Sequence, residues 1–105
     1  MGYRGGIMAK GDIVNDVVSV GNGGTLIYQP ASGVEVIIFS LGMVNSANAT
    51  VKFTDGTNHT VICEGKQSAN NSGITKIGLT NTNYLRLQND TGTTHPLGFS
   101  GIQSK

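Results

Sequence analysis

Hydrophobic and polar residues alternate along much of this chain with a period of two, which is the pattern of β-strands. In Ala49–Thr54, Val51 and Phe53 point to one face and polar residues to the other. Tyr84–Gln88 repeats the pattern with two inward leucines. Between Thr54 and Thr60, the dipeptide Asp55-Gly56 suits a tight turn because both residues tolerate positive φ, so it predicts a β-hairpin.

Eight segments show this alternation or a short apolar run, and turn residues separate them. They span residues 13–20, 26–28, 34–41, 49–54, 60–64, 74–79, 84–88 and 97–103. No window of twelve residues carries an apolar stripe at helical period. The spacing predicts an all-β chain: a single antiparallel β-sandwich, a jelly roll or a small barrel.

The densest apolar stretch is Gly24–Val44, and it predicts two strands joined by a turn. Pro30 suits the first central position of that turn because its ring fixes φ, and Gly33 can adopt a positive φ. Residues 34–41 are apolar on both faces, unlike an antiparallel strand with one face in water.

The surplus face of that strand carries Ile37, Phe39 and Leu41. Exposed apolar area of this kind normally marks an interface. Two explanations stay open: burial in a homo-oligomer, or burial inside a more closed barrel.

Composition narrows the classes of function. The chain has 105 residues, which suits one domain, and its sixteen glycines with many Asn, Ser and Thr residues disfavour helix. Its formal charge of +1 predicts no attraction to nucleic acid or to anionic lipid. No apolar stretch approaches the length of about 20 residues that spans a bilayer.

The first twelve residues have no periodic pattern and predict a flexible arm before a sandwich domain at residues 13–105. This start lacks the apolar core of a secretory signal. Met8 is an alternative biological start.

Candidate chemistry is sparse, so we predict a protein that is not an enzyme and needs no metal or cofactor. His59 and His95 have no Cys, Asp or Glu at metal-ligand spacing and fall in turns. Cys63 lies in a predicted strand, and we expect its side chain to be a small buried hydrophobe.

Three outward residues form the best candidate for surface recognition. Tyr84 and Arg86 share one face of their strand, and Lys52 joins them if the two strands are neighbours. An outward Tyr also serves as a cross-strand packing residue, and that alternative stays open.

Two stretches resemble small virion proteins of tailed bacteriophages. One is TLIYQPASGVEVIIFSLGMVNSANATVKFTDGT, with its Tyr-x-Pro-Ala strand end and Thr-Val-x-Phe strand, and the other is the ending NYLRLQND…LGFSGIQSK. Together they cover roughly residues 24–105. The resemblance implies a capsid decoration (cement) protein or a tail-associated β-sandwich, often trimeric, without catalytic residues.

On this basis we expect a virion protein, assembled in the host cytoplasm, that stabilises a phage capsid by bridging neighbouring subunits. Its partners would be the major capsid protein or other virion proteins, and copies of itself, with a trimer favoured. The expected capsid contacts of the arm are Tyr3, Arg4, Ile7 and Lys10. The alternative is a carbohydrate- or receptor-binding module of a phage tail or fibre.

Overall fold

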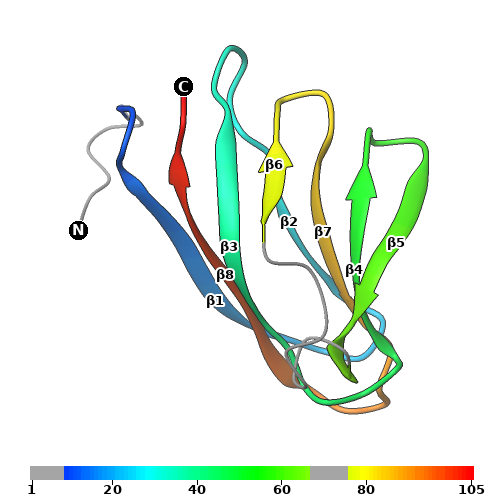
Figure 1. Cartoon of the computed structure of the whole chain (residues 1–105). Coiled ribbons are helices and arrows are strands. Elements are labelled where there is room, and N and C mark those ends of the chain that lie inside the picture. Colours follow the sequence, from blue (N-terminus) through cyan, green and yellow to red (C-terminus); the bar gives the residue numbers. More distant parts are fainter. Residues whose placement is uncertain (1–8, 67–75) are drawn as a thin grey trace.

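The structure, a computed structural model, describes residues 9–66 and 76–105, which form two antiparallel sheets of four strands each (Figure 1). The first sheet has the order β1 (Ile13–Val20), β8 (His95–Gln103), β3 (Val36–Gly42) and β6 (Ile77–Leu79). The second has the order β2 (Thr25–Tyr28), β7 (Tyr84–Asn89), β4 (Ala49–Thr54) and β5 (His59–Glu64). The predicted all-β sandwich of eight strands is confirmed.

The strand order is that of a jelly roll. The pairs β1–β8, β2–β7, β3–β6 and β4–β5 all occur, as in a long antiparallel hairpin wrapped into two sheets. Only β4 and β5 are consecutive strands of one sheet, and every other connection crosses between sheets. The Asp55-Gly56 hairpin is therefore confirmed, and Gly56 has the expected positive φ of 97°.

The turn after β2 differs in detail from the prediction. The backbone N–H of Val34 donates to the carbonyl of Ala31, so the central residues are Ser32 and Gly33. Gly33 has a φ of 81°, as expected. The prediction for Pro30 is wrong: it precedes the turn and is fully buried, because the chain passes there from one sheet to the other.

The inward faces of both sheets supply one core. Its buried members are Val14, Val20, Leu26, Val36, Ile38, Val51, Cys63, Ile77, Leu79, Leu85, Leu87, Leu97 and Phe99. Tyr28 of β2 and Phe99 of β8 join the two sheets, with ring centroids 4.9 Å apart. The predicted burial of Cys63 is confirmed, since its side chain is only 4% exposed.

A β-bulge in β3 changes the expected alternation. Ile38 pairs with Gly101 and Ser40 with Ser100, which leaves Phe39 as the extra residue. A bulge inserts one residue, so the side chains beyond it exchange faces. Leu41 consequently packs against the core, and the prediction that it shares an outward face with Ile37 is wrong.

Residues 9–12, which we assigned to the flexible arm, form a turn that is hydrogen-bonded to the first sheet. The N–H of Asp12 donates to the carbonyl of Ala9, and the Asp12 carboxylate accepts from the N–H of Ala9. Gly11 and Asp12 also exchange backbone hydrogen bonds with Gln103. Lys10 lies exposed in this turn, whereas Tyr3, Arg4 and Ile7 fall outside the described residues.

Candidate binding surfaces

The outer face of the first sheet carries a row of apolar side chains across three strands. Ile13 of β1 pairs with Ile102 of β8, which pairs in turn with Ile37 of β3. Paired residues in adjacent strands project to the same face. Ile13 is 68% exposed, and the other two are half-buried. Three isoleucines therefore meet on a face where an isolated sandwich would place polar residues.

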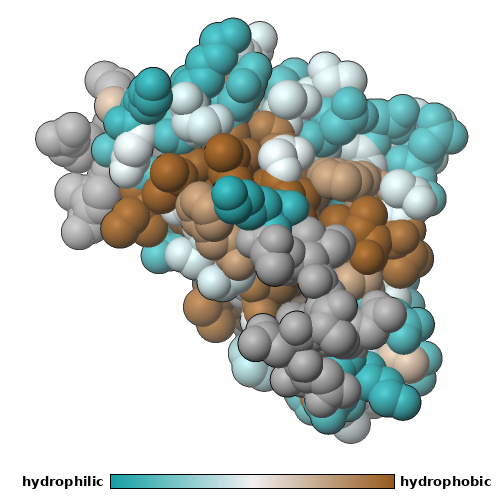
Figure 2. Space-filling model, viewed as in Figure 1, coloured by the Kyte–Doolittle hydropathy of each residue, from teal (hydrophilic) through white to brown (hydrophobic). Residues whose placement is uncertain are grey.

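Two further apolar side chains lie on the same face of the sheet, and we call the five residues together the apolar face. Val17 of β1 is 76% exposed, and the bulged Phe39 of β3 is 44% exposed. Figure 2 shows hydrophobic atoms at the surface over the upper parts of β1, β8 and β3. Ile37 and Phe39 were predicted for an interface. Ile13, Val17 and Ile102 were missed because a sequence does not show which strands are neighbours.

A trough of about 600 Å³ lies beside the apolar face. It is lined by residues 40–44 around the end of β3, residues 95–100 of β8, and Val17. Val17, Gly98 and Gly42 are consecutive cross-strand partners. Since two of these three positions carry no side chain, they leave room that larger residues would fill.

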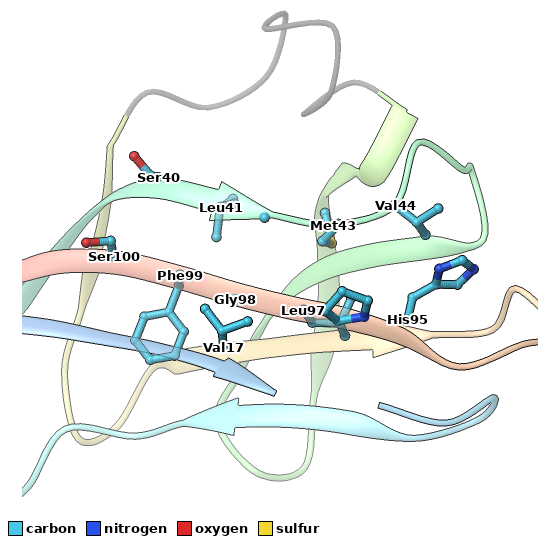
Figure 3. Close-up of a pocket in the computed structure, with 12 residues that line it drawn as sticks. Val17, Ser40, Leu41, Met43, Val44, His95, Leu97, Gly98, Phe99 and Ser100 are labelled. Carbon is cyan, nitrogen blue, oxygen red and sulfur yellow. The ribbon is translucent and has the colours of Figure 1, made fainter. Parts of the chain in front are cut away.

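The trough is suited to apolar contact. Figure 3 shows Ser40 and Ser100 at one end and His95 at the other, with Leu41 and Leu97 between them. The imidazole Nε2 of His95 lies 3.0 Å from the hydroxyl of Thr93. The serine hydroxyls are thus not placed beside the histidine as a nucleophile and its base would be.

The outer face of the second sheet brings together the three predicted recognition residues. β4 and β7 are neighbours, Lys52 pairs directly with Arg86, and Thr54 pairs with Tyr84. The Lys52 ammonium donates to the Gln88 side-chain oxygen at 3.0 Å. The condition for Lys52 to join Tyr84 and Arg86, that the two strands are neighbours, is therefore met.

The same row continues to both edges of the second sheet. Ile27 of β2 pairs with Arg86, and Val61 of β5 pairs with Lys52. Ile27 is 49% exposed and Val61 is 53% exposed. We call Ile27, Arg86, Lys52 and Val61 the cationic row. Its two apolar ends, Ile27 and Val61, were missed.

A smaller hollow, of about 180 Å³, lies at the tip of the β4–β5 hairpin. The Asp55 carboxylate there accepts hydrogen bonds from the backbone N–H groups of Thr57 and Asn58 and from the Asn58 side chain. These bonds lower the pKa of Asp55 from 3.8 to about 2. The carboxylate is engaged in holding the turn.

The remaining candidates for chemistry, Cys63 and His59, have surroundings that suit a structural role. Burial raises the pKa of the Cys63 thiol, and the neighbouring Glu64 carboxylate adds to this, so the reactive thiolate is disfavoured. His59 Nδ1 lies 2.7 Å from the Thr54 hydroxyl. Within residues 9–66 and 76–105, no three His, Cys, Asp or Glu side chains gather as a metal site. The same residues contain no helix long and apolar enough to cross a membrane.

Comparisons with known proteins give one fold likeness. No protein-family model matches the chain, and no curated protein matches it. Among solved structures, it is similar to a de novo designed double-stranded β-helix, determined by solution NMR. The two share 18% identity with a TM-score of 0.46, over 86% of this chain and 97% of the designed one.

Proposed function

We propose that this chain is a non-enzymatic virion structural protein that decorates a phage capsid and stabilises it by bridging neighbouring subunits. The observation that carries the proposal is the apolar face on the first sheet, where Ile13, Ile102 and Ile37 form one cross-strand row. Exposed apolar area on a small jelly roll is suited to burial against another protein. Jelly rolls are also a common architecture of capsid proteins.

Binding to capsid shells tests this proposal. The protein is mixed with shells assembled from the major capsid protein of the same phage, and the co-sedimenting fraction is measured. We expect the wild type to sediment with the shells. Ile37→Lys places a charge inside the contact and should weaken binding by at least about tenfold. Val61→Lys, on the opposite sheet, is the matched control and should bind like the wild type.

A wild type that stays in the supernatant would overturn the decoration role. The predicted arm contact is tested separately by deleting residues 1–8. Residues 9–12 are retained because Gly11 and Asp12 hydrogen-bond to β8. Undiminished binding of this deletion would remove Tyr3, Arg4 and Ile7 from the mechanism.

A second candidate function is a carbohydrate- or receptor-binding module of a phage tail or fibre. The observation that favours it is the convergence of Lys52, Tyr84 and Arg86 on the outer face of the second sheet. A glycan array separates the two candidates, since a protein that only decorates a capsid has no sugar ligand.

A further inference from the structure

Within the described part of the chain, neither of the two cations at the centre of the cationic row forms an ion pair with a carboxylate. Lys52 and Arg86 are direct cross-strand partners. The ion pair that the described residues form lies elsewhere, between Lys105 and Glu35. Lys52 reaches Asp90 only through the Gln88 amide, by bonds of 3.0 and 2.8 Å. Like charges directly opposite each other destabilise a sheet, so a bound anion would be stabilising here.

The Arg86 guanidinium has one donor without a partner. Its Nε is buried and has no hydrogen-bond partner among the described residues. Burial of Nε holds the side chain against the sheet, while the residue as a whole is half-buried. A partly desolvated, positioned guanidinium is well suited to binding a carboxylate.

Apolar side chains stand at both ends of these cations. Ile27 and Val61 lie on the two edge strands of the second sheet, and each is about half exposed. With neighbouring strands about 4.8 Å apart, four positions in a row span about 14 Å. The row therefore presents apolar, cationic, cationic and apolar groups in sequence.

We infer that the cationic row binds an extended segment of a partner protein with the pattern apolar-x-acidic-x-apolar. In an extended chain, alternate side chains lie on one face about 6.7 Å apart, so such a segment spans about 13 Å. Its acidic side chain then falls between Arg86 and Lys52. Its apolar side chains cover Ile27 and Val61.

The apolar ends favour a protein partner over an acidic saccharide. A sugar acid would pair with Lys52 and Arg86 and leave Ile27 and Val61 exposed to water. A peptide covers all four positions. Arg and Tyr are also enriched in protein–protein interfaces, and Tyr84 lies beside this row on the same face of β7.

A peptide titration tests the inference. The probe is a fluorescein-labelled Gly-Ser-Leu-Thr-Glu-Thr-Leu-Ser-Gly peptide, and fluorescence anisotropy is measured at low and at physiological ionic strength. We expect saturable binding that weakens with salt. Replacing the Glu of the peptide with Gln should weaken binding by at least about tenfold, since a charge-assisted contact is lost.

Variants of the protein locate the site. Arg86→Gln and Lys52→Gln should each weaken peptide binding by about tenfold, and Ile27→Ser should weaken it without changing its salt dependence. Lys10→Gln removes an exposed cation from the turn that precedes β1 and should bind like the wild type. Thermal unfolding of each variant confirms that it is folded.

Three results would overturn the inference: no binding by the wild type, binding by Arg86→Gln and Lys52→Gln that equals binding by the wild type, or binding of polygalacturonate but not of the peptide. The inference does not depend on capsid decoration, and it narrows the second candidate function to a protein partner. Co-sedimentation with shells responds to Ile37→Lys, whereas the peptide titration responds to Arg86→Gln. The two proposals can therefore fail separately.

Discussion

At the scale of single residues, Asp55 couples the β4–β5 turn to pH. Its carboxylate accepts three hydrogen bonds within the turn, and these lower its pKa to about 2. A group with a depressed native pKa stabilises the fold above its unfolded pKa and loses that contribution as pH falls through its native pKa. The stabilisation that Asp55 contributes is therefore lost as pH falls from about 4 to about 2.

We expect Asp55→Ala to lower the thermal midpoint at pH 6 and to differ less from the wild type as pH falls from 4 to 2. The reason is that the protonated wild-type side chain also loses its charge-assisted bonds. Thermal unfolding followed by circular dichroism across this range measures the difference. Asp55→Asn is the control. Its side chain retains a hydrogen-bond acceptor but has no carboxylate, so this position should add no pH dependence to the stability. A difference between Asp55→Ala and wild type that stays constant down to pH 2 would contradict the assignment.

Asn89 is the buried polar residue at which two connections meet. Its amide group donates to the carbonyls of Val20 and Thr93, and its oxygen accepts from the backbone N–H and the hydroxyl of Thr91. Both amide donors and the acceptor are satisfied, although the side chain is fully buried. The Asn89 side chain therefore links the β7–β8 connection to the end of β1 by hydrogen bonds.

Asn89→Ala should lower the free energy of unfolding by about 3 kcal/mol, because the buried Val20 carbonyl and the part-buried Thr93 carbonyl lose their donor. Asn89→Asp should cost more, since it turns a carboxylate toward those carbonyls. Asn22→Ala is the matched control: the Asn22 side chain accepts a single exposed bond, from the Gly92 N–H, and its loss should cost less than about 1 kcal/mol. Urea denaturation measures all three, and equal losses for Asn89→Ala and Asn22→Ala would contradict this role.

At the scale of elements, β8 and β3 approach each other closely at the bulge. A side chain at Gly101 would collide with the Ile37 carbonyl and would lie 2.8 Å from the Ile38 Cα. These obstacles are backbone atoms, which cannot rotate away as a side chain would. The glycine thus permits the bend that turns Leu41 into the core.

Gly101→Ala should destabilise the protein by about 2 kcal/mol or more, as expected for overpacking against backbone. Gly78→Ala is the matched control on β6, where an added methyl group meets nothing within 4 Å. We expect that control to be neutral or slightly stabilising, because Ala has less freedom in the unfolded chain. Equal effects of the two substitutions in urea denaturation would exclude the proposed close approach.

The Asp16 side chain partly closes the exposed edge of β1. Gln103 N–H donates to the Asp12 carbonyl, and this register directs the N–H of Val17 away from β8. The Asp16 carboxylate accepts that N–H at 2.9 Å. A charged side chain on an edge strand discourages pairing with another chain.

Asp16→Val removes both the charge and the acceptor, so we expect stronger self-association than in the wild type. Light scattering over a concentration series measures it. Asp16→Asn keeps an oxygen for Val17 and should associate less than Asp16→Val. If all three proteins behaved alike, Asp16 would have no protective role.

The strands themselves could be predicted because alternation is a local property. The observed bounds of β1 and β4 coincide with the predicted ones, and the inward leucines of β7 are buried. The bulge at Phe39 could not be predicted, since it depends on the partner position Gly101. Because of that one inserted residue, Leu41 packs against the core and does not lie on the predicted outward face.

At the scale of the whole molecule, the sequence predicted the fold class but not the assignment of strands to sheets. Crossing connections separate β2 from β3, although the two are consecutive. The apolar face joins Ile13 to Ile102, which lie at opposite ends of the described chain. Neither relation can be derived from local periodicity, so the full composition of the two candidate surfaces required the pairing of β1 with β8 and of β4 with β7.

The apolar face also predicts how protomers associate. A sheet face with three isoleucines, Phe39 and Val17 should be covered in solution, and self-association is the expected outcome for the purified protein. Multi-angle light scattering should give a multiple of the protomer mass. Ile13→Lys together with Ile37→Lys should give monomers with retained β-sheet circular dichroism, whereas Val61→Lys on the opposite sheet should stay associated. A wild type that is monomeric at high concentration would contradict the subunit contact predicted for Phe39.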